Sequence, residues 1–299
     1  MNTCTTRKGC QENKKMQMIS QLILGVQHLH KLNIVHRDLK PQNVLLDDKN
    51  QIKISDMGLA KKMPNGRNSM SQTTNAGTIG WMAAEAMREG GRMSKKVDIF
   101  SLGCLIHYIF KKRHPFGDKF QREGNILNNK PNILETGLSR WLIGTMIAYE
   151  GLRRPTIDEV AIHPLFWSAD KRLRFLIDTS DLLEFQREDS SMVLAWEAYI
   201  TKIVGPSGDW SKCIAKELKA DLVRYRSYNT TKLRDLIRVI RNKAGHYRDL
   251  PPALQNVLGS LPEGYTEYFQ TKFPMLLPQA YLFIKRHRAP GDVFEKYYT

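Results

Sequence analysis

The stretch IVHRDLKPQNVLLDDKNQIKISDMG, residues 34–58, decides the fold of the first part of the chain. It contains two short strand-like runs, Val44-Leu45-Leu46 and Ile52-Lys53-Ile54, with a turn-forming Asp/Asn segment between them. This order predicts a short β-hairpin. The polar segment 36–43 comes directly before the hairpin, and the polar segment 55–58 directly follows it.

Apolar residues predict helices on both sides of this hairpin. Before it, they recur at helical spacing and predict an amphipathic helix over 16–32, carried by Ile19, Leu22, Ile23, Val26 and Leu29. After it, residues 95–110 favour a strongly apolar, buried helix. The second half of the chain has no alternating strand pattern, so we predict a mainly α-helical protein with short β-hairpins in its first part.

The two polar segments resemble the catalytic loop and the metal-binding triplet of protein kinases. Phosphoryl transfer needs a carboxylate to orient the attacking hydroxyl, a cation near the transferred phosphate and two oxygen ligands for magnesium. The resemblance assigns these roles to Asp38, Lys40 and the pair Asn43 and Asp56, and it implies ATP or ADP with Mg²⁺ as the ligand. The alternative is a chance polar loop, which is disfavoured because both motifs and their separation agree.

Further motifs extend the resemblance through the kinase C-lobe. Ala83-Ala84-Glu85 resembles the end of an activation segment, and Arg153-Arg154-Pro155 resembles the site of the arginine that pairs with it, so the resemblance implies a buried Glu85–Arg154 ion pair. In such kinases an arginine placed like Arg37 meets a phosphate on the activation segment. The candidate acceptors are Ser69, Ser71, Thr73 and Thr74, although each also fits a plain polar surface loop.

The sequence departs from the kinase pattern in three places. Met57 stands where most kinases have Phe, and Ala84 where they have Pro. Only 35 residues precede His36, and they contain no G-x-G-x-x-G motif, so we expect the kinase N-lobe to be absent. A fragment, a truncated gene model and a kinase remnant that serves as a scaffold all remain open, and so does kinase activity.

A second group of motifs lies near the C-terminus: YRSY at 225–228, LRDLIRVIRNK at 233–243 and GHYR at 245–248. RNA can be cut without a metal if one group deprotonates the 2′-hydroxyl, another protonates the departing 5′-oxygen and a cation stabilises the phosphorane. Tyr228, His246 and Arg241 are of these three types. The spacing of the 233–243 segment predicts a helix with one buried apolar face and a neighbouring arginine row, made of Arg234, Arg238 and Arg241.

These motifs resemble the kinase-extension nuclease domain of the inositol-requiring unfolded-protein-response sensors and of the related 2-5A-dependent ribonuclease L. The resemblance implies His246 as general acid, Tyr228 as general base, and Arg241 and Asn242 as phosphate-binding and orienting residues, with no cofactor for the nuclease. The family commonly has two adjacent histidines where this chain has Gly245 and His246. The plainer interpretation of His246 is a helix-capping residue, and that of Lys232, Arg234 and Arg238 is a solvated basic face.

Composition agrees with an anionic partner. The chain has 299 residues and 46 Lys and Arg against 30 Asp and Glu, a formal net charge of +16. Residues 212–248 alone hold eleven basic residues against three acidic ones. We expect no membrane span, no signal peptide, no zinc site and a reduced cytosolic setting.

We therefore predict an unassigned segment over 1–15, a protein kinase-like C-lobe over 16–168 and an all-helical kinase-extension nuclease domain over 169–299. The resemblance implies a metal-independent endoribonuclease that cleaves stem-loop RNA, coupled to a Ser/Thr kinase-like domain in the unfolded-protein response to ER stress. The expected partners are RNA and further copies of the chain, as a homodimer or higher oligomer. The expected location is cytoplasmic, or the cytosolic face of the endoplasmic reticulum if the chain is part of a longer sensor. The alternatives are a Ser/Thr kinase that binds ATP and whose N-lobe is missing, and a non-catalytic pseudokinase scaffold.

Overall fold

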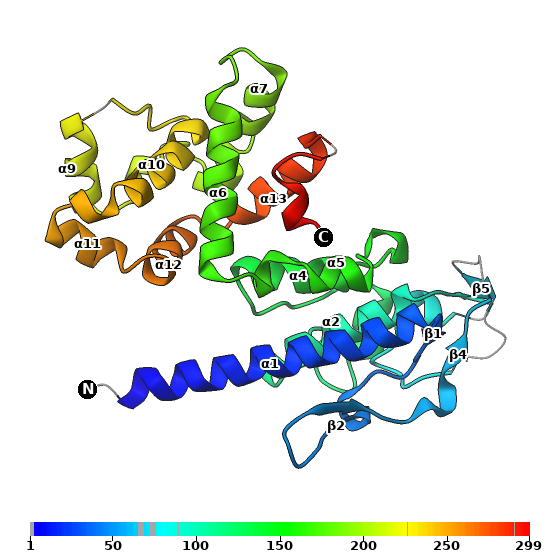
Figure 1. Ribbon diagram of the computed structural model, residues 1–299. Coiled ribbons are helices and arrows are strands. Elements are labelled where there is room, and N and C mark those ends of the chain that lie inside the picture. The colour runs from blue at the N-terminus through cyan, green and yellow to red at the C-terminus, as the bar shows by residue number, and fades with distance from the viewer. Residues whose placement is uncertain (1–2, 65–68, 72–75, 89, 226, 290) are drawn as a thin grey trace. The chain divides into compact units, whose positions relative to one another are not determined.

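The computed structural model describes all residues except 1–2, 65–68, 72–75, 89, 226 and 290 (Figure 1). The chain divides into two compact units, Met1–Phe166 and Trp167–Thr299. The division falls two residues before the position at which the sequence analysis placed it.

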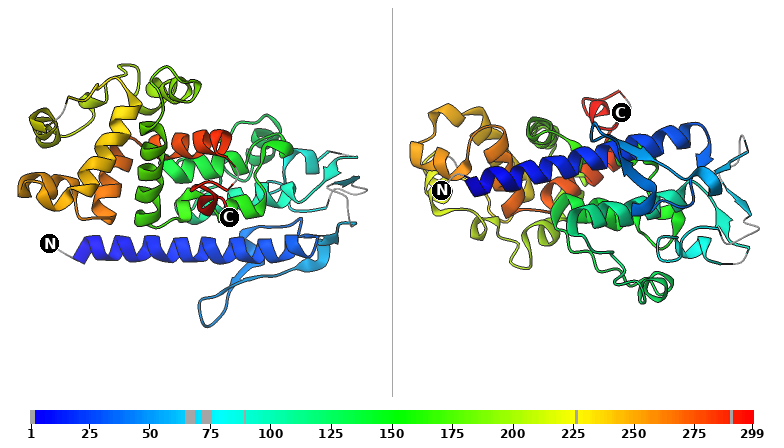
Figure 2. Two further views of the ribbon diagram at one scale, coloured as in Figure 1. Left: turned by 45° about the horizontal axis from the view of Figure 1, so that its top comes forward. Right: turned by 90° about the horizontal axis from the view of Figure 1, so that it is seen from below.

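The first unit is built around two helices, α1 (Thr3–Lys31) and α2 (Lys96–Lys111), which contact each other (Figure 1). Three shorter helices complete its helical part: α3 (Arg122–Leu127), α4 (Gly137–Met146) and α5 (Ile157–Ala161). Both views in Figure 2 show α1 as one continuous helix. It begins thirteen residues before the expected residue 16 and therefore covers most of the segment left unassigned. Its apolar face, including Leu22 and Val26, is buried in the same core cluster as Phe100 and Leu102 of α2.

Within the described residues of this unit, the strands are short and form three antiparallel pairs. The pairs are β1 with β4 (Ile34–Val35, Lys61–Lys62), β2 with β3 (Val44–Leu46, Ile52–Ile54) and β5 with β6 (Met70–Ser71, Arg92–Met93). In the middle pair Val44 lies opposite Ile54, as the predicted hairpin requires. The pairing continues beyond the strands, because Ser55 N donates to Asn43 O at 2.9 Å. The hairpin therefore joins the two polar segments at its open end.

The second unit is helical throughout its described residues. Its helices are α6 (Ala169–Glu184), α7 (Ser191–Glu197), α8 (Ile200–Val204), α9 (Lys216–Tyr225), α10 (Leu233–Gly245), α11 (Pro252–Leu258), α12 (Glu263–Lys272) and α13 (Leu276–His287). The helices α10, α12 and α13 contact α6, and α10 does so most extensively. On α10 the predicted apolar face is almost fully buried: Leu233, Leu236, Ile237 and Ile240. This packing places the arginine row of α10 beside α6.

Among the residues that the structure describes, no helix has both the length and the apolar character needed to span a bilayer.

Candidate functional site

Asp38 lies at the centre of a closed hydrogen-bond network in the first unit. Its Oδ2 accepts from Lys40 Nζ at 2.6 Å and from Asn43 Nδ2 at 3.1 Å. Its Oδ1 accepts from the backbone N and the hydroxyl of Thr78, at 2.9 and 2.6 Å. Lys40 Nζ also donates to Thr78 Oγ1 at 2.7 Å, so three of the residues contact one another. Thr78 did not appear in the sequence analysis.

This network sets the charge state of Asp38. Burial raises the pKa of the carboxyl, but the hydrogen bonds from Lys40 and Thr78 and the charge of Lys40 outweigh burial and hold the pKa below its ordinary value. Asp38 is therefore ionised at neutral pH, the state needed to accept a hydroxyl proton.

Asn43 and Asp56 supply oxygen atoms of the kind that Mg²⁺ prefers. Asn43 donates through Nδ2 to the main-chain and side-chain oxygens of Asp38, which leaves its amide oxygen as the atom suited to a metal ion. Asp56 has left-handed backbone torsions, and its exposed carboxylate accepts from Gly58 N at 3.4 Å. Mg²⁺ is commonly held by one or two protein ligands and substrate phosphates, so two oxygen donors fit a magnesium–nucleotide complex. Within the described residues no group of three or more His, Cys, Asp or Glu side chains is placed to hold a metal ion by itself.

Glu85 and Arg154 form the ion pair implied by the kinase resemblance. Arg154 NH1 and NH2 lie 2.5 and 3.0 Å from the two oxygens of Glu85, which is a bidentate arrangement. Arg154 also donates through Nε to Ala148 O at 2.7 Å, and its guanidinium lies 5.0 Å from the Phe100 ring centroid. The guanidinium is fully buried, so the pair ties the segment around Glu85 to the core.

The proposed phosphate acceptors are only partly described. Ser69 is half-buried, and Ser71 lies in β5. Thr73 and Thr74 lie outside the described residues. Arg37 donates through NH1 to Leu59 O at 3.4 Å.

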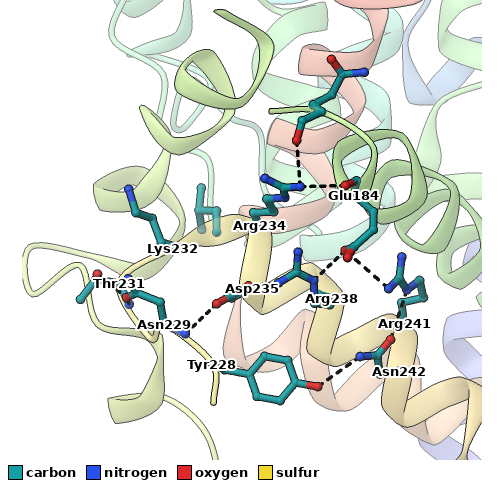
Figure 3. A network of polar contacts seen from close by, with 12 residues as sticks. Glu184, Tyr228, Asn229, Thr231, Lys232, Arg234, Asp235, Arg238, Arg241 and Asn242 are labelled. Atoms are coloured by element: carbon teal, nitrogen blue, oxygen red, sulfur yellow. Dashed lines mark hydrogen bonds and ion pairs between the residues drawn. The ribbon is translucent and has the colours of Figure 1, made fainter. Parts of the chain in front are cut away.

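In the second unit, Tyr228, Asn242 and Arg241 form a hydrogen-bonded row (Figure 3). Asn242 Nδ2 donates to Tyr228 Oη at 3.1 Å, and Arg241 Nε donates to Asn242 Oδ1 at 3.2 Å. Arg241 and Asn242 come from the last turns of α10, whereas Tyr228 comes from the loop before this helix. The loop is anchored next to Tyr228, since Asn229 N donates to Asp235 Oδ2 at 2.6 Å.

His246 stands at the end of α10, apart from this row. It is the C-cap residue, and its backbone N donates to Asn242 O at 3.0 Å, one turn back along the helix. Its side chain is 77% exposed, with Nδ1 3.5 Å from Asp249 Oδ2. The structure thus brings three of the four predicted nuclease residues into direct contact and leaves His246 open to solvent.

The arginine row of α10 contacts carboxylates and main-chain oxygens rather than solvent alone. Arg238 Nε lies 2.6 Å from Glu184 Oε2, and Arg238 NH1 lies 2.5 Å from Asp235 Oδ1. Arg234 donates through NH2 to the main-chain oxygens of Glu184 and Gln186. Lys232 alone of these residues has an exposed side chain. A solvated basic face is therefore the wrong description for Arg234 and Arg238, because α6 lies against them.

In the second unit the sequence analysis missed three acidic site residues, which are Asp181 and Glu184 of α6 and Asp235 of α10. Asp181 Oδ1 accepts from Arg241 NH1 at 2.8 Å, and Glu184 Oε2 lies 3.6 Å from Arg241 NH2. Burial raises the pKa of Glu184, but the arginines outweigh burial and hold the pKa below its ordinary value. Their i, i+3 spacing puts Asp181 and Glu184 on one face of α6, yet no pattern in the sequence indicates that α10 covers that face.

Comparisons with known proteins match both units. The protein kinase domain family matches residues 1–166, and the family described as Ribonuclease 2-5A matches residues 172–298. "Probable serine/threonine-protein kinase ireA" of Dictyostelium discoideum is 44% identical over 96% of this chain and 29% of its own length. "Serine/threonine-protein kinase/endoribonuclease IRE1a" of Arabidopsis thaliana is 40% identical over 95% of this chain and 34% of its own length. "Sensor for unfolded proteins in the ER ire1" of Schizosaccharomyces pombe is 39% identical over 94% of this chain and 30% of its own length.

The chain thus spans about a third of the length of these relatives. The matched kinase domain alone covers more than half of the chain, and the nuclease match begins six residues after it ends. The chain belongs to the inositol-requiring family of serine/threonine-protein kinase/endoribonucleases, in which a protein kinase domain is followed by a Ribonuclease 2-5A domain.

Proposed function

We propose that the second unit is an endoribonuclease that cleaves stem-loop RNA without a metal ion. The contact row of Tyr228, Asn242 and Arg241 is the observation that supports this most. It joins a proton acceptor to a phosphate-binding cation through an amide that orients both. RNA suits such a site because its 2′-hydroxyl is an internal nucleophile that DNA lacks.

In the proposed reaction Tyr228 acts as a phenolate and takes the proton of the 2′-hydroxyl, and the 2′-oxygen attacks the adjacent phosphorus. Arg241 balances the charge of the phosphorane, and His246 donates a proton to the departing 5′-oxygen. The products are a 2′,3′-cyclic phosphate and a 5′-hydroxyl end. Asn242 holds the Tyr228 side chain in place by donating a hydrogen bond to its oxygen. The exposure of His246 leaves its ring accessible to an RNA backbone.

We further propose that this activity serves signalling in the unfolded-protein response. The names of the relatives, which include a sensor for unfolded proteins in the ER, support this role. RNA would be the substrate, and a second copy of the chain would complete an active dimer. The cytoplasm, or the cytosolic face of the endoplasmic reticulum, would be its location.

A cleavage assay on a stem-loop RNA in EDTA, run beside a binding titration, tests the nuclease. His246→Ala removes the proposed proton donor, and loss of a general acid lowers rates by about 10²- to 10⁴-fold. Binding should survive, because the phosphate contacts of Arg241 and of the other basic residues remain in place. Cleavage at the parent rate by His246→Ala would refute the role of His246, and loss of parent cleavage in EDTA would refute the metal-independent mechanism. No cleavage by the parent under any of these conditions would favour a non-catalytic scaffold.

Phosphoryl transfer is the second candidate function, and the Asp38–Lys40–Thr78 network favours it. Family membership implies nucleotide and Mg²⁺ binding in general. When bound, the magnesium–nucleotide supplies the phosphoryl group. Asp38 would accept the hydroxyl proton, Lys40 would neutralise the transferred phosphate, and Asn43 and Asp56 would hold the metal.

Residues 1–35 hold no glycine-rich phosphate loop, so we expect the 299-residue chain alone to transfer no labelled phosphate. Fusion to the N-lobe of a relative should restore transfer, and Asp56→Ala should abolish it in the fusion. Incorporation by the unfused chain that is lost on Asp56→Ala would contradict this expectation.

A further inference from the structure

A groove of about 400 Å³ lies beside the candidate nuclease residues of the second unit. It is lined by residues of α6 and α10 and by Leu261 and Pro262. Arg241 and Asp181 both line it, together with apolar side chains such as Ile177. The residue proposed to bind the scissile phosphate therefore faces this groove.

Arg241 already has an anionic partner in this groove. Its NH1 donates to Asp181 Oδ1 at 2.8 Å, and the Asp181 side chain is 50% exposed. Its Nε is used by Asn242, and its NH2 lies 3.6 Å from Glu184 Oε2. A carboxylate and a phosphodiester both present oxygens to a guanidinium in the same manner. Asp181 thus stands where an anionic oxygen of the substrate would bind.

We propose that Asp181 occupies the phosphate position of Arg241 in this groove until a phosphate of the RNA strand displaces it. The inference rests on the proposed nuclease function. Asp181 is suited to displacement because it is half-exposed and touches Arg241 through one oxygen. Glu184 is not, because its carboxylate also holds Arg238 and is more buried. The Asn242 contact keeps Arg241 in place during the exchange.

Asp181→Asn tests the exchange, because the amide keeps the shape of the side chain and removes its charge. An exposed ion pair is worth little, so we expect a gain of about two- to fivefold in affinity for a non-cleavable stem-loop RNA with a 2′-O-methyl group at the scissile nucleotide. In cleavage of ordinary RNA the gain should appear as a lower KM with kcat unchanged or reduced.

The matched control is Asp189→Asn, which removes the same charge from an exposed ion pair with Arg187 in the same unit, outside the groove. Asp181→Glu keeps the charge and should therefore lack the gain in RNA affinity. In an Arg241→Ala background the effect of Asp181→Asn should shrink to that of Asp189→Asn.

Three results would overturn the proposal: equal gains from Asp181→Asn and Asp189→Asn, a gain that persists without Arg241, or weaker RNA binding by Asp181→Asn. The last would mean that Asp181 holds Arg241 in its active position. The binding arm uses RNA that is not cut, so it is independent of the His246→Ala result that decides the nuclease function.

Discussion

Asn242→Ala tests whether the Tyr228–Asn242–Arg241 row is needed for RNA cleavage. The substitution removes two hydrogen bonds, from Asn242 Nδ2 to Tyr228 Oη at 3.1 Å and from Arg241 Nε to Asn242 Oδ1 at 3.2 Å. Each such bond contributes about 0.5–1.5 kcal/mol. If both are needed in the transition state, about 1–3 kcal/mol is lost, which is about a 5- to 150-fold slower reaction.

The fold should tolerate this change. Asn242 lies inside α10, where alanine is the better helix former. The higher helix propensity of alanine offsets part of the lost hydrogen bonds, so thermal melting should fall only slightly, while single-turnover cleavage of a stem-loop RNA slows clearly. Asn256→Ala is the control, because Asn256 is an exposed position of α11 in the same unit.

A double-mutant cycle with Tyr228→Phe identifies the partner. Without the Tyr228 hydroxyl, Asn242→Ala can lose only its contact with Arg241, so its effect on the rate should be clearly smaller. An equal effect in both backgrounds would show that Asn242 does not act through Tyr228. A parent rate for Asn242→Ala would refute the reasoning altogether.

Three further predictions concern stability, pH and assembly. Glu85→Ala leaves the buried Arg154 guanidinium unpaired and should cost about 3–5 kcal/mol in urea unfolding of the first unit, whereas Glu150→Ala, which breaks an exposed pair, should cost less than about 1 kcal/mol. A small cost for Glu85→Ala would mean that water reaches Arg154. Burial lowers the pKa of His114 to about 3, so the unfolded chain binds a proton that the folded chain does not, and stability present above pH 6.5 is lost as the pH falls towards 3. His114→Asn should flatten this pH dependence of unfolding by up to about 1.4 kcal/mol per pH unit, and an unchanged slope would contradict the assignment. If two nuclease units must face each other, specific RNA cleavage should rise with protein concentration, and constant activity on dilution of a monomer would exclude that requirement.

The sequence predicted those helices and strands whose pattern depends on residues close together in the chain. The apolar spacing in 233–243 identified the buried face of α10, because a helix must bury one stripe wherever it packs. The hairpin at 44–54 also agrees with the structure, because its turn-forming residues join adjacent strands. The segment before residue 16 has no apolar repeat, so nothing in its pattern indicated that α1 begins at Thr3.

The sequence did not predict contacts between residues that lie far apart along the chain. Spacing along α10 placed Arg234, Arg238 and Arg241 outside the core, but it carried no information on the helix that covers them. Asp181 and Glu184 lie more than fifty residues earlier, and only the packing of α6 on α10 brings them to Arg238 and Arg241. The roles of Tyr228, Asn242 and His246 came from family resemblance and remain predictions.

The carboxylates beside the arginine row change how RNA affinity should depend on salt concentration. Affinity between basic proteins and nucleic acid falls with added salt because each neutralised phosphate releases condensed counterions. Residues 212–248 hold eleven basic residues, but Arg238, Arg241 and Lys243 already have carboxylates beside them. When RNA takes the place of a carboxylate such as Asp181, a protein group moves aside and gains its own shell of cations. The neighbouring carboxylates act as counterions that belong to the protein itself. The RNA affinity of this unit should therefore depend less on ionic strength than its formal charge suggests.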